Sequence, residues 1–133
     1  MSDTVLVAYD GGVPSRNALA FAAERAGRTG DELHVYHILE DEKDAAAIRA
    51  DVESLLAETA PDVDAEIVFE ERDQPSDSTN VSLAKRLLDR IDRYNYAMVV
   101  LGNEEHSALE ELTLPSLTKA VLETRSIPVL LVP

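Results

Sequence analysis

The sequence predicts an α/β fold, an open parallel sheet of five strands with helices on both faces. Segments of strand character alternate along the chain with segments of helical periodicity, which is typical of βαβ units. The strand segments are mostly continuous apolar runs, as expected for strands that are buried on both faces. The length of 133 residues suits one hydrophobic core, so we expect a single domain over residues 1–133.

The first strand and helix are predicted within residues 4–30. The apolar run at 4–9 indicates a buried strand, and Asp10-Gly11-Gly12 then forms a turn. From Ser15 onward, alanine and leucine recur at helical spacing as far as Gly30, a residue type that commonly ends helices. The alanine-rich face of this helix is expected to pack close to the sheet.

The next segments continue the alternation. Residues 33–39 predict a second strand, and apolar positions within 45–56 predict a helix that ends before Pro61. A shorter third strand is expected at 65–69. Residues 70–79 carry acids and hydroxyls without an apolar period, so we interpret them as a loop. This loop ends in three candidate helix caps, Ser78, Thr79 and Asn80.

The C-terminal part predicts two further helices and two strands. Residues 81–91 carry an apolar stripe of helical period, and the apolar run 97–101 predicts the fourth strand. A second long loop is expected at 103–113. Pro115 suits the first position of a fourth helix, and the apolar residues 127–132 predict the last strand.

Charge and composition restrict the classes of partner. The chain has 12 lysine and arginine residues against 26 aspartates and glutamates, a net charge of −14, so we expect neither nucleic acid nor membrane as a partner. No apolar stretch approaches the ~20 residues of a bilayer span, and the N-terminus lacks a basic signal region, so we expect a cytoplasmic protein. The lack of cysteine excludes disulfides and thiolate metal sites.

The acidic excess resembles that of cytosolic proteins from extreme halophiles. Molar salt shortens the Debye length to ~3 Å, which makes such a surface tolerable. An acidic protein from a mesophile is the alternative, because net charge reports on solubility and not on fold. In both cases the carboxylates are expected on a solvated surface.

Polar and glycine residues follow two of the predicted strands. In open α/β sheets, ligands bind beyond the carboxyl ends of the strands, at the point where the strand order reverses. Asp10-Gly11-Gly12 and Gly102-Asn103 are the two candidate ends. The sequence therefore predicts that a binding site would form between them.

The ordered set of these segments resembles the universal stress protein family. The resemblance rests on Val7 to Gly11 followed by Ser15, on Val99 to Gly102, on Ser116 at a helix start, and on the proline-led strand 127–132. It implies a flavodoxin-like sheet with strand order 3-2-1-4-5. It also implies a homodimer with a role in stress tolerance or regulation, acting by binding and not by turnover.

The family pattern for ATP is incomplete in this chain. Members that bind ATP carry a glycine, two residues, a glycine, nine residues, and then a glycine followed by serine or threonine. Gly102 and Ser116 match, whereas Glu105 and Pro115 replace the second and third glycines. A carboxylate and an imino ring cannot donate hydrogen bonds to a phosphate. We therefore expect no ATP cofactor; an adenine-nucleotide-binding regulator and a small adenine-nucleotide hydrolase remain as alternatives.

The candidate binding residues lie at the strand ends and at the start of the last helix. They are Ala8, Tyr9, Asp10, Ile38, Leu101, Gly102, Ser116 and Leu117. Asp10 either contacts a ligand or accepts backbone amides in a turn. Tyr9 and Ile38 either line an adenine pocket or belong to the core.

No catalytic residue and no metal site is expected. The chain has no P-loop, G-x-S-x-G or H-E-x-x-H motif. His34 and His37 lie three residues apart on a strand, so they are expected to face opposite sides of the sheet and cannot share a metal.

The last strand is the candidate dimer interface. The family order puts Val129, Leu130, Leu131 and Val132 at a sheet edge, where an apolar strand with open backbone groups favours pairing with a second copy. The alternative is a monomer whose edge is covered by residues 103–113.

Overall fold

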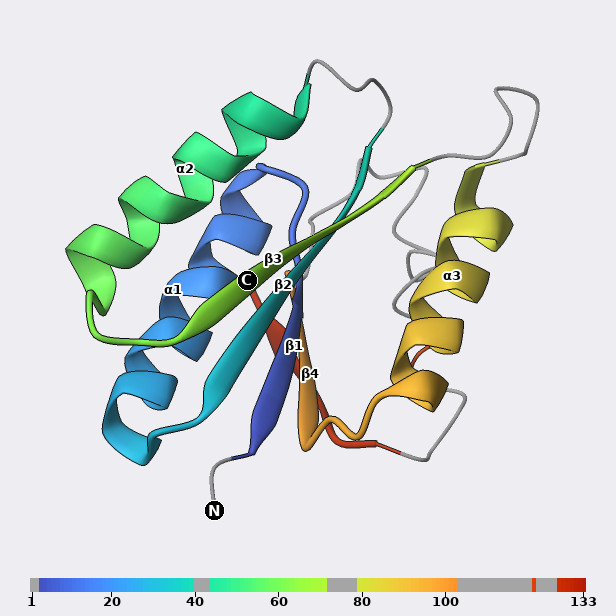
Figure 1. Cartoon of the computed structure of the whole chain (residues 1–133). Coiled ribbons are helices and arrows are strands. Elements are labelled where there is room, and N and C mark those ends of the chain that lie inside the picture. The colour runs from blue at the N-terminus through green and yellow to red at the C-terminus, as the bar shows by residue number, and fades with distance from the viewer. Residues whose placement is uncertain (1–2, 40–43, 72–78, 103–120, 122–126) are drawn as a thin grey trace.

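The computed structural model describes the chain except for residues 1–2, 40–43, 72–78, 103–120 and 122–126. The strands are β1 (Thr4–Ala8), β2 (Glu32–Leu39), β3 (Ala65–Glu71), β4 (Met98–Gly102) and β5 (Val129–Val132). The helices are α1 (Val13–Thr29), α2 (Asp44–Thr59) and α3 (Thr79–Arg93). The strands form one parallel sheet in the order β3-β2-β1-β4-β5 (Figure 1), which confirms the predicted fold and strand order.

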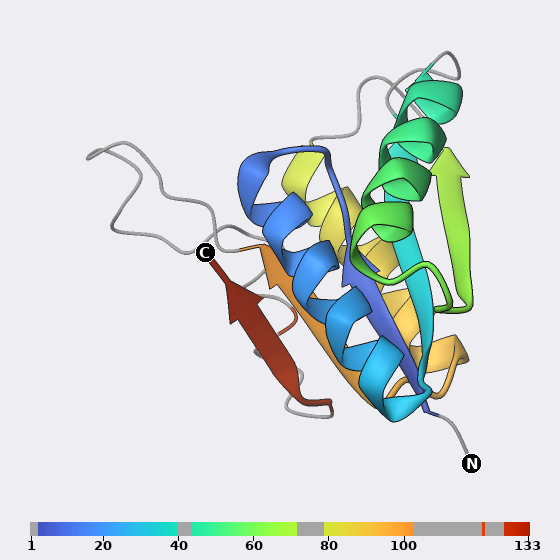
Figure 2. The ribbon, with the colours of Figure 1, turned by 90° about the vertical axis from the view of Figure 1, so that its left-hand side faces the viewer.

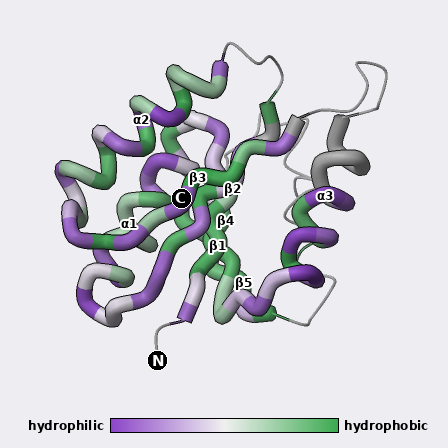
Figure 3. The backbone as a smooth tube through the Cα atoms, in the orientation of Figure 1, coloured by the Kyte–Doolittle hydropathy of each residue, from purple (hydrophilic) through white to green (hydrophobic). Residues whose placement is uncertain are grey.

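Helices cover both faces of the sheet. Helices α1 and α2 lie on one face and α3 on the other (Figure 1), and the hydrophobic residues concentrate on the central strands between them (Figure 3). Alternate strand residues therefore enter two separate cores. Val7 and Val35 pack with the α1 side, whereas Leu6, Val99 and Leu101 pack with the α3 side.

The small face of α1 brings this helix close to the sheet, as the sequence predicts. Its buried residues are Ser15, Ala18, Leu19, Ala22, Ala23 and Ala26. The helix ends at Gly30, whose φ of 82° is left-handed and whose N–H donates to Ala26 O at 2.8 Å. It begins at Val13, two residues before the predicted start, because Pro14 fits the first turn of a helix.

Several predicted boundaries are wrong by one or two residues. Strand β3 runs to Glu71, so that Glu70 and Glu71 are not in a loop but pair with Ile38 and Leu39 of β2. The long parallel ladder overrides their polar character. The predicted helix at 81–91 begins at Thr79, one of the three candidate caps. Strands β4 and β5 begin one and two residues later than predicted.

The remaining C-terminal predictions fall largely outside the described residues. The loop at 103–113 and Pro115 lie there. Val121 is described, is helical and is fully buried in the core on the α3 side. Within the described ranges, no helix has both the length and the apolar character needed to cross a membrane.

Candidate functional site

The carboxyl ends of β1 and β4 lie side by side at the point where the strand order reverses. Val7 pairs with Val100, and the chain leaves β1 toward β2 on one side and returns to β4 on the other. This arrangement brings together five of the predicted residues, which are Ala8, Tyr9, Asp10, Leu101 and Gly102. Such a switch point is where open α/β sheets bind ligands.

The other three predicted residues are not placed with this group. Ile38 lies near the end of β2, two residues beyond Tyr36, which pairs with Ala8. The Ile38 side chain lies outside the described part of the structure, and so do the whole residues Ser116 and Leu117. Their assignment to the site stays a prediction.

Asp10 forms a turn at the start of α1. Its Oδ1 atom accepts a hydrogen bond from the Gly12 N–H at 2.7 Å and lies 2.7 Å from the hydroxyl of Ser15, which donates to it. Ser15 is buried, and its Oγ also accepts the Asp10 N–H at 3.3 Å. These are the contacts expected of a turn aspartate. They place a carboxylate at the positive end of a long helix.

Gly102 brings the end of β4 into direct contact with α1. A Cβ atom at this position would lie 2.5 Å from both Pro14 C and Ser15 N. Only glycine allows this approach. By sequence, Gly102 is the first glycine of the phosphate pattern, and the structure gives it a packing role as well.

Tyr9 is a core residue. Its side chain is 3% exposed, and its hydroxyl donates to Asp51 of α2, which also forms an ion pair with Arg16 at 3.5 Å. The Tyr9 carbonyl lies 2.7 Å from His37 Nδ1, and the Tyr9 N–H donates to Tyr36 O. Of the two interpretations of Tyr9, the structure favours the core.

The two histidines face opposite sides of the sheet, as predicted. His34 is on the α3 side, where its Nδ1 lies 2.8 Å from the Tyr96 hydroxyl and its Nε2 lies 3.3 Å from Glu66. His37 packs edge-on against Phe69. Across the described residues, no three histidine or carboxylate side chains gather as they would around a metal ion.

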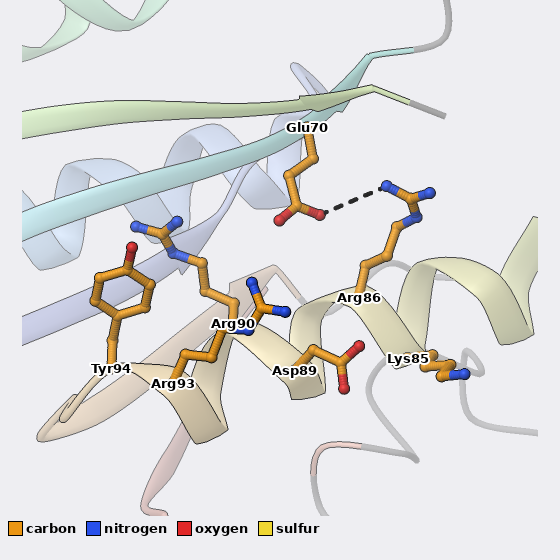
Figure 4. A pocket seen from close by; sticks show the side chains of 7 residues that line it. All are labelled: Glu70, Lys85, Arg86, Asp89, Arg90, Arg93 and Tyr94. Atoms are coloured by element: carbon orange, nitrogen blue, oxygen red, sulfur yellow. Dashed lines mark ion pairs between the residues drawn. The ribbon is translucent and has the colours of Figure 1, made fainter. Parts of the chain in front are cut away.

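A second polar region, which the sequence patterns did not predict, lies on the α3 side. A cavity of about 420 Å³ opens between α3 and the end of β3 (Figure 4), and its lining residues are Glu70, Lys85, Arg86, Asp89, Arg90, Arg93 and Tyr94. The sequence feature that indicates this region is a local cluster of basic residues. Four of the 12 lysine and arginine residues fall within residues 85–93.

Buried tyrosine hydroxyls give the fold a predicted sensitivity to alkali. Burial raises the pKa of Tyr36, and the hydrogen bond that it donates to Glu70 at 2.6 Å raises it further; burial also raises the pKa values of Tyr9 and Tyr96. Above pH ~10, the unfolded chain loses these protons while the folded chain keeps them, so stability falls as the pH rises.

Denaturant unfolding at pH 9 to 12 measures this effect. The free energy of unfolding should decrease over this range, and the decrease should be smaller in Tyr36→Phe than in the unmodified protein. A free energy of unfolding that stays constant from pH 9 to 12 would contradict the prediction.

The strand order and the helices on both faces define a flavodoxin-like α/β fold. The chain belongs to the universal stress protein family, because the sequence model of that family matches residues 1–133. No protein of curated function matches the chain in sequence.

Solved structures of universal stress proteins are similar over nearly the whole chain. One from Archaeoglobus fulgidus DSM 4304 has 26% sequence identity and a TM-score of 0.75, covering 98% of this chain and 43% of the longer protein. A complex with cAMP has 21% identity and a TM-score of 0.75, covering 98% and 96% of the two chains. A complex with dAMP from Archaeoglobus fulgidus has 18% identity and a TM-score of 0.68, covering 100% and 98%.

Proposed function

We propose that this universal stress protein acts as a homodimeric regulator that binds a partner or small ligand, without an ATP triphosphate and without turnover. The observation that carries the proposal is the position of the Asp10 carboxylate. It occupies the Gly12 N–H and the Ser15 hydroxyl at the start of α1. A helix start favours phosphate, but a phosphate placed at this one would meet the negative charge of Asp10.

The charge of the following segment supports the same proposal. Glu105 and Pro115 stand where the ATP pattern has glycines, and Glu104, Glu110 and Glu111 add negative charge between Gly102 and Lys119. A carboxylate ~7 Å from a phosphate charge costs about 0.6 kcal/mol in bulk water and about 2.4 kcal/mol at an effective dielectric constant of 20. Several such terms are enough to remove micromolar affinity for a triphosphate.

A regulator that binds an adenine mononucleotide is the second candidate. Two of the similar structures are complexes with dAMP and cAMP. A single phosphate group brings less negative charge to the acidic strand ends than a triphosphate does. This candidate therefore requires fewer favourable contacts than ATP binding.

Calorimetric titration in molar KCl tests both candidates. The unmodified protein should give no saturable heat with ATP and Mg²⁺, whereas the double variant Glu105→Gly, Pro115→Gly should gain affinity for ATP by at least about tenfold, because it removes one carboxylate and restores one backbone N–H donor. Saturable heat with AMP alone would favour the mononucleotide regulator. Micromolar binding of ATP to the unmodified protein would overturn the proposal, and phosphate release above background would indicate the hydrolase.

The homodimer proposal rests on the edge strand β5. In the described part of the chain, β5 pairs with β4 only, and it lies at the border of the sheet (Figure 2). The Val99 N–H donates to Pro128 O, so the backbone groups of residue 128 point toward β4. Backbone groups alternate in direction along a strand. The N–H and C=O groups of Val129 and Leu131 therefore point away from β4. An apolar edge of this kind is a template for a second copy.

Replacing Leu131 with proline should convert the dimer to a monomer. Proline removes an outward N–H while the bonds to β4 stay intact. The control is Leu131→Ala, which shortens the side chain but keeps the N–H, and it should remain dimeric. Light scattering coupled to size exclusion at high salt gives the mass, and a Leu131→Pro variant that elutes as a dimer would contradict edge pairing.

A further inference from the structure

The α3 side of the molecule concentrates positive charge within an acidic protein. The cavity between α3 and the end of β3 is lined by four cationic side chains, Lys85, Arg86, Arg90 and Arg93. Among the described residues, two carboxylates, Glu70 and Asp89, line it with them, although the chain has 26 acidic residues against 12 basic ones. Over the described lining, the balance of charge is therefore the reverse of that of the whole chain.

Two of the arginines are held in place by neighbouring side chains. Arg90 Nε donates to the Tyr96 hydroxyl at 3.0 Å, and its guanidinium carbon lies 4.0 Å from the centre of the Tyr94 ring. Arg86 Nη1 lies 3.8 Å from Glu70, and its side chain is 19% exposed. A guanidinium that is already ordered loses less conformational entropy when it binds an anion.

The carboxylates leave most of this charge available. Glu70 is shared between two partners, because it pairs with Arg86 and also accepts a hydrogen bond from the Tyr36 hydroxyl at 2.6 Å. Among the described residues, neither Arg90 nor Arg93 has a carboxylate within ion-pair distance. Figure 4 shows Arg86 facing Glu70, with Arg90 and Arg93 on the C-terminal half of α3 and the Arg90 guanidinium beside the ring of Tyr94, which follows the helix.

We propose that this cavity is a binding site for a small inorganic phosphate anion, such as pyrophosphate. Arginine side chains bind phosphate through paired N–H donors, which matches a site with three guanidinium groups. The volume of about 420 Å³ is in the range of small-molecule sites and favours such a ligand over an extended peptide. The site uses α3 and β3, and so it does not depend on what the ends of β1 and β4 bind.

Titration with inorganic pyrophosphate, followed by the amide signals of the ¹⁵N-labelled full chain, tests the proposal. Ionic strength is kept constant with KCl, so that screening does not change during the titration. Saturable shifts are expected at Arg86, Arg90, Arg93 and Tyr94. Saturable shifts at Gly102 and the strand ends instead would overturn the site and would also count against the proposed function.

Two charge-matched double variants make the test specific. Arg90→Gln with Arg93→Gln should weaken pyrophosphate binding by about tenfold or more, because hydrogen bonds to charged groups are lost. Arg25→Gln with Arg28→Gln removes the same charge from the exposed surface of α1 and should leave the affinity within about twofold.

The single variant Arg93→Gln keeps the test valid if the loss of Arg90 impairs folding. Among the described residues, no side chain forms a hydrogen bond, ion pair or ring contact with Arg93, so its replacement should not disturb the fold. It should also weaken binding. Shifts that do not saturate, or an equal loss of affinity in the variant of α1, would overturn the proposal.

Discussion

Replacing Gly102 with alanine is expected to lower the free energy of unfolding by about 3 kcal/mol or more. The added methyl carbon would lie 2.5 Å from the backbone of Pro14 and Ser15, where no side chain can rotate away. Either the end of β4 or the first turn of α1 must move. Denaturant unfolding monitored by circular dichroism gives the change in the unfolding midpoint.

Gly27→Ala is the matched control. Gly27 lies within α1, and its added carbon would be 3.7 Å from the Ala60 and Val63 side chains, which is an ordinary contact. Alanine favours helix formation over glycine, so this variant should gain about 0.5 to 1 kcal/mol. If both variants changed stability by the same amount, the close approach at Gly102 would not be the cause.

Replacing Leu87 with alanine should cost about 2 to 5 kcal/mol. Leu87 is fully buried on α3 and packs in the core that also contains Leu6, Val99 and Leu101. Truncation leaves a cavity that the closely packed strands cannot fill. Chemical unfolding gives the loss of stability, and hydrogen exchange should show faster exchange along α3.

The neighbouring Leu88 provides the comparison. It is only partly buried at the margin of the same core. Leu88→Ala should therefore lose less than half as much stability as Leu87→Ala, because less apolar surface leaves water on folding. Equal losses at the two positions would show that α3 packs in another orientation.

Most of the fold was predictable from apolar patterning. Apolar segments located all five strands, some of them continuous runs and the one at 33–39 an alternating pattern, and the spacing of Ala18, Ala22 and Ala26 identified the helix face that meets the sheet. The strand order came from the resemblance to a family, since local patterning does not specify which strands become neighbours. Boundaries failed where tertiary pairing prevailed over local composition, as at Glu70 and Glu71.

The candidate site was predictable only in part. The rule for strand ends brought Asp10 and Gly102 together correctly, because the carboxyl ends of neighbouring parallel strands meet. The hydrogen bonds from Ser15 and Gly12 to Asp10 depend on the turn geometry, and the sequence does not specify them. The cavity on the α3 side was missed because its residues come from two elements, and their proximity follows from the packing of α3 on β2 and β3.

The separation of the tyrosines by the sheet has a spectroscopic consequence. The chain has four tyrosines and no tryptophan, so tyrosine dominates its intrinsic fluorescence. Tyr9 contacts Asp51 on the α2 side, whereas Tyr36, Tyr94 and Tyr96 all lie toward α3. In a Tyr9→Phe variant, the remaining tyrosines would all lie on the α3 side of the sheet. The intrinsic fluorescence of this variant would therefore report on events on that side without an added label.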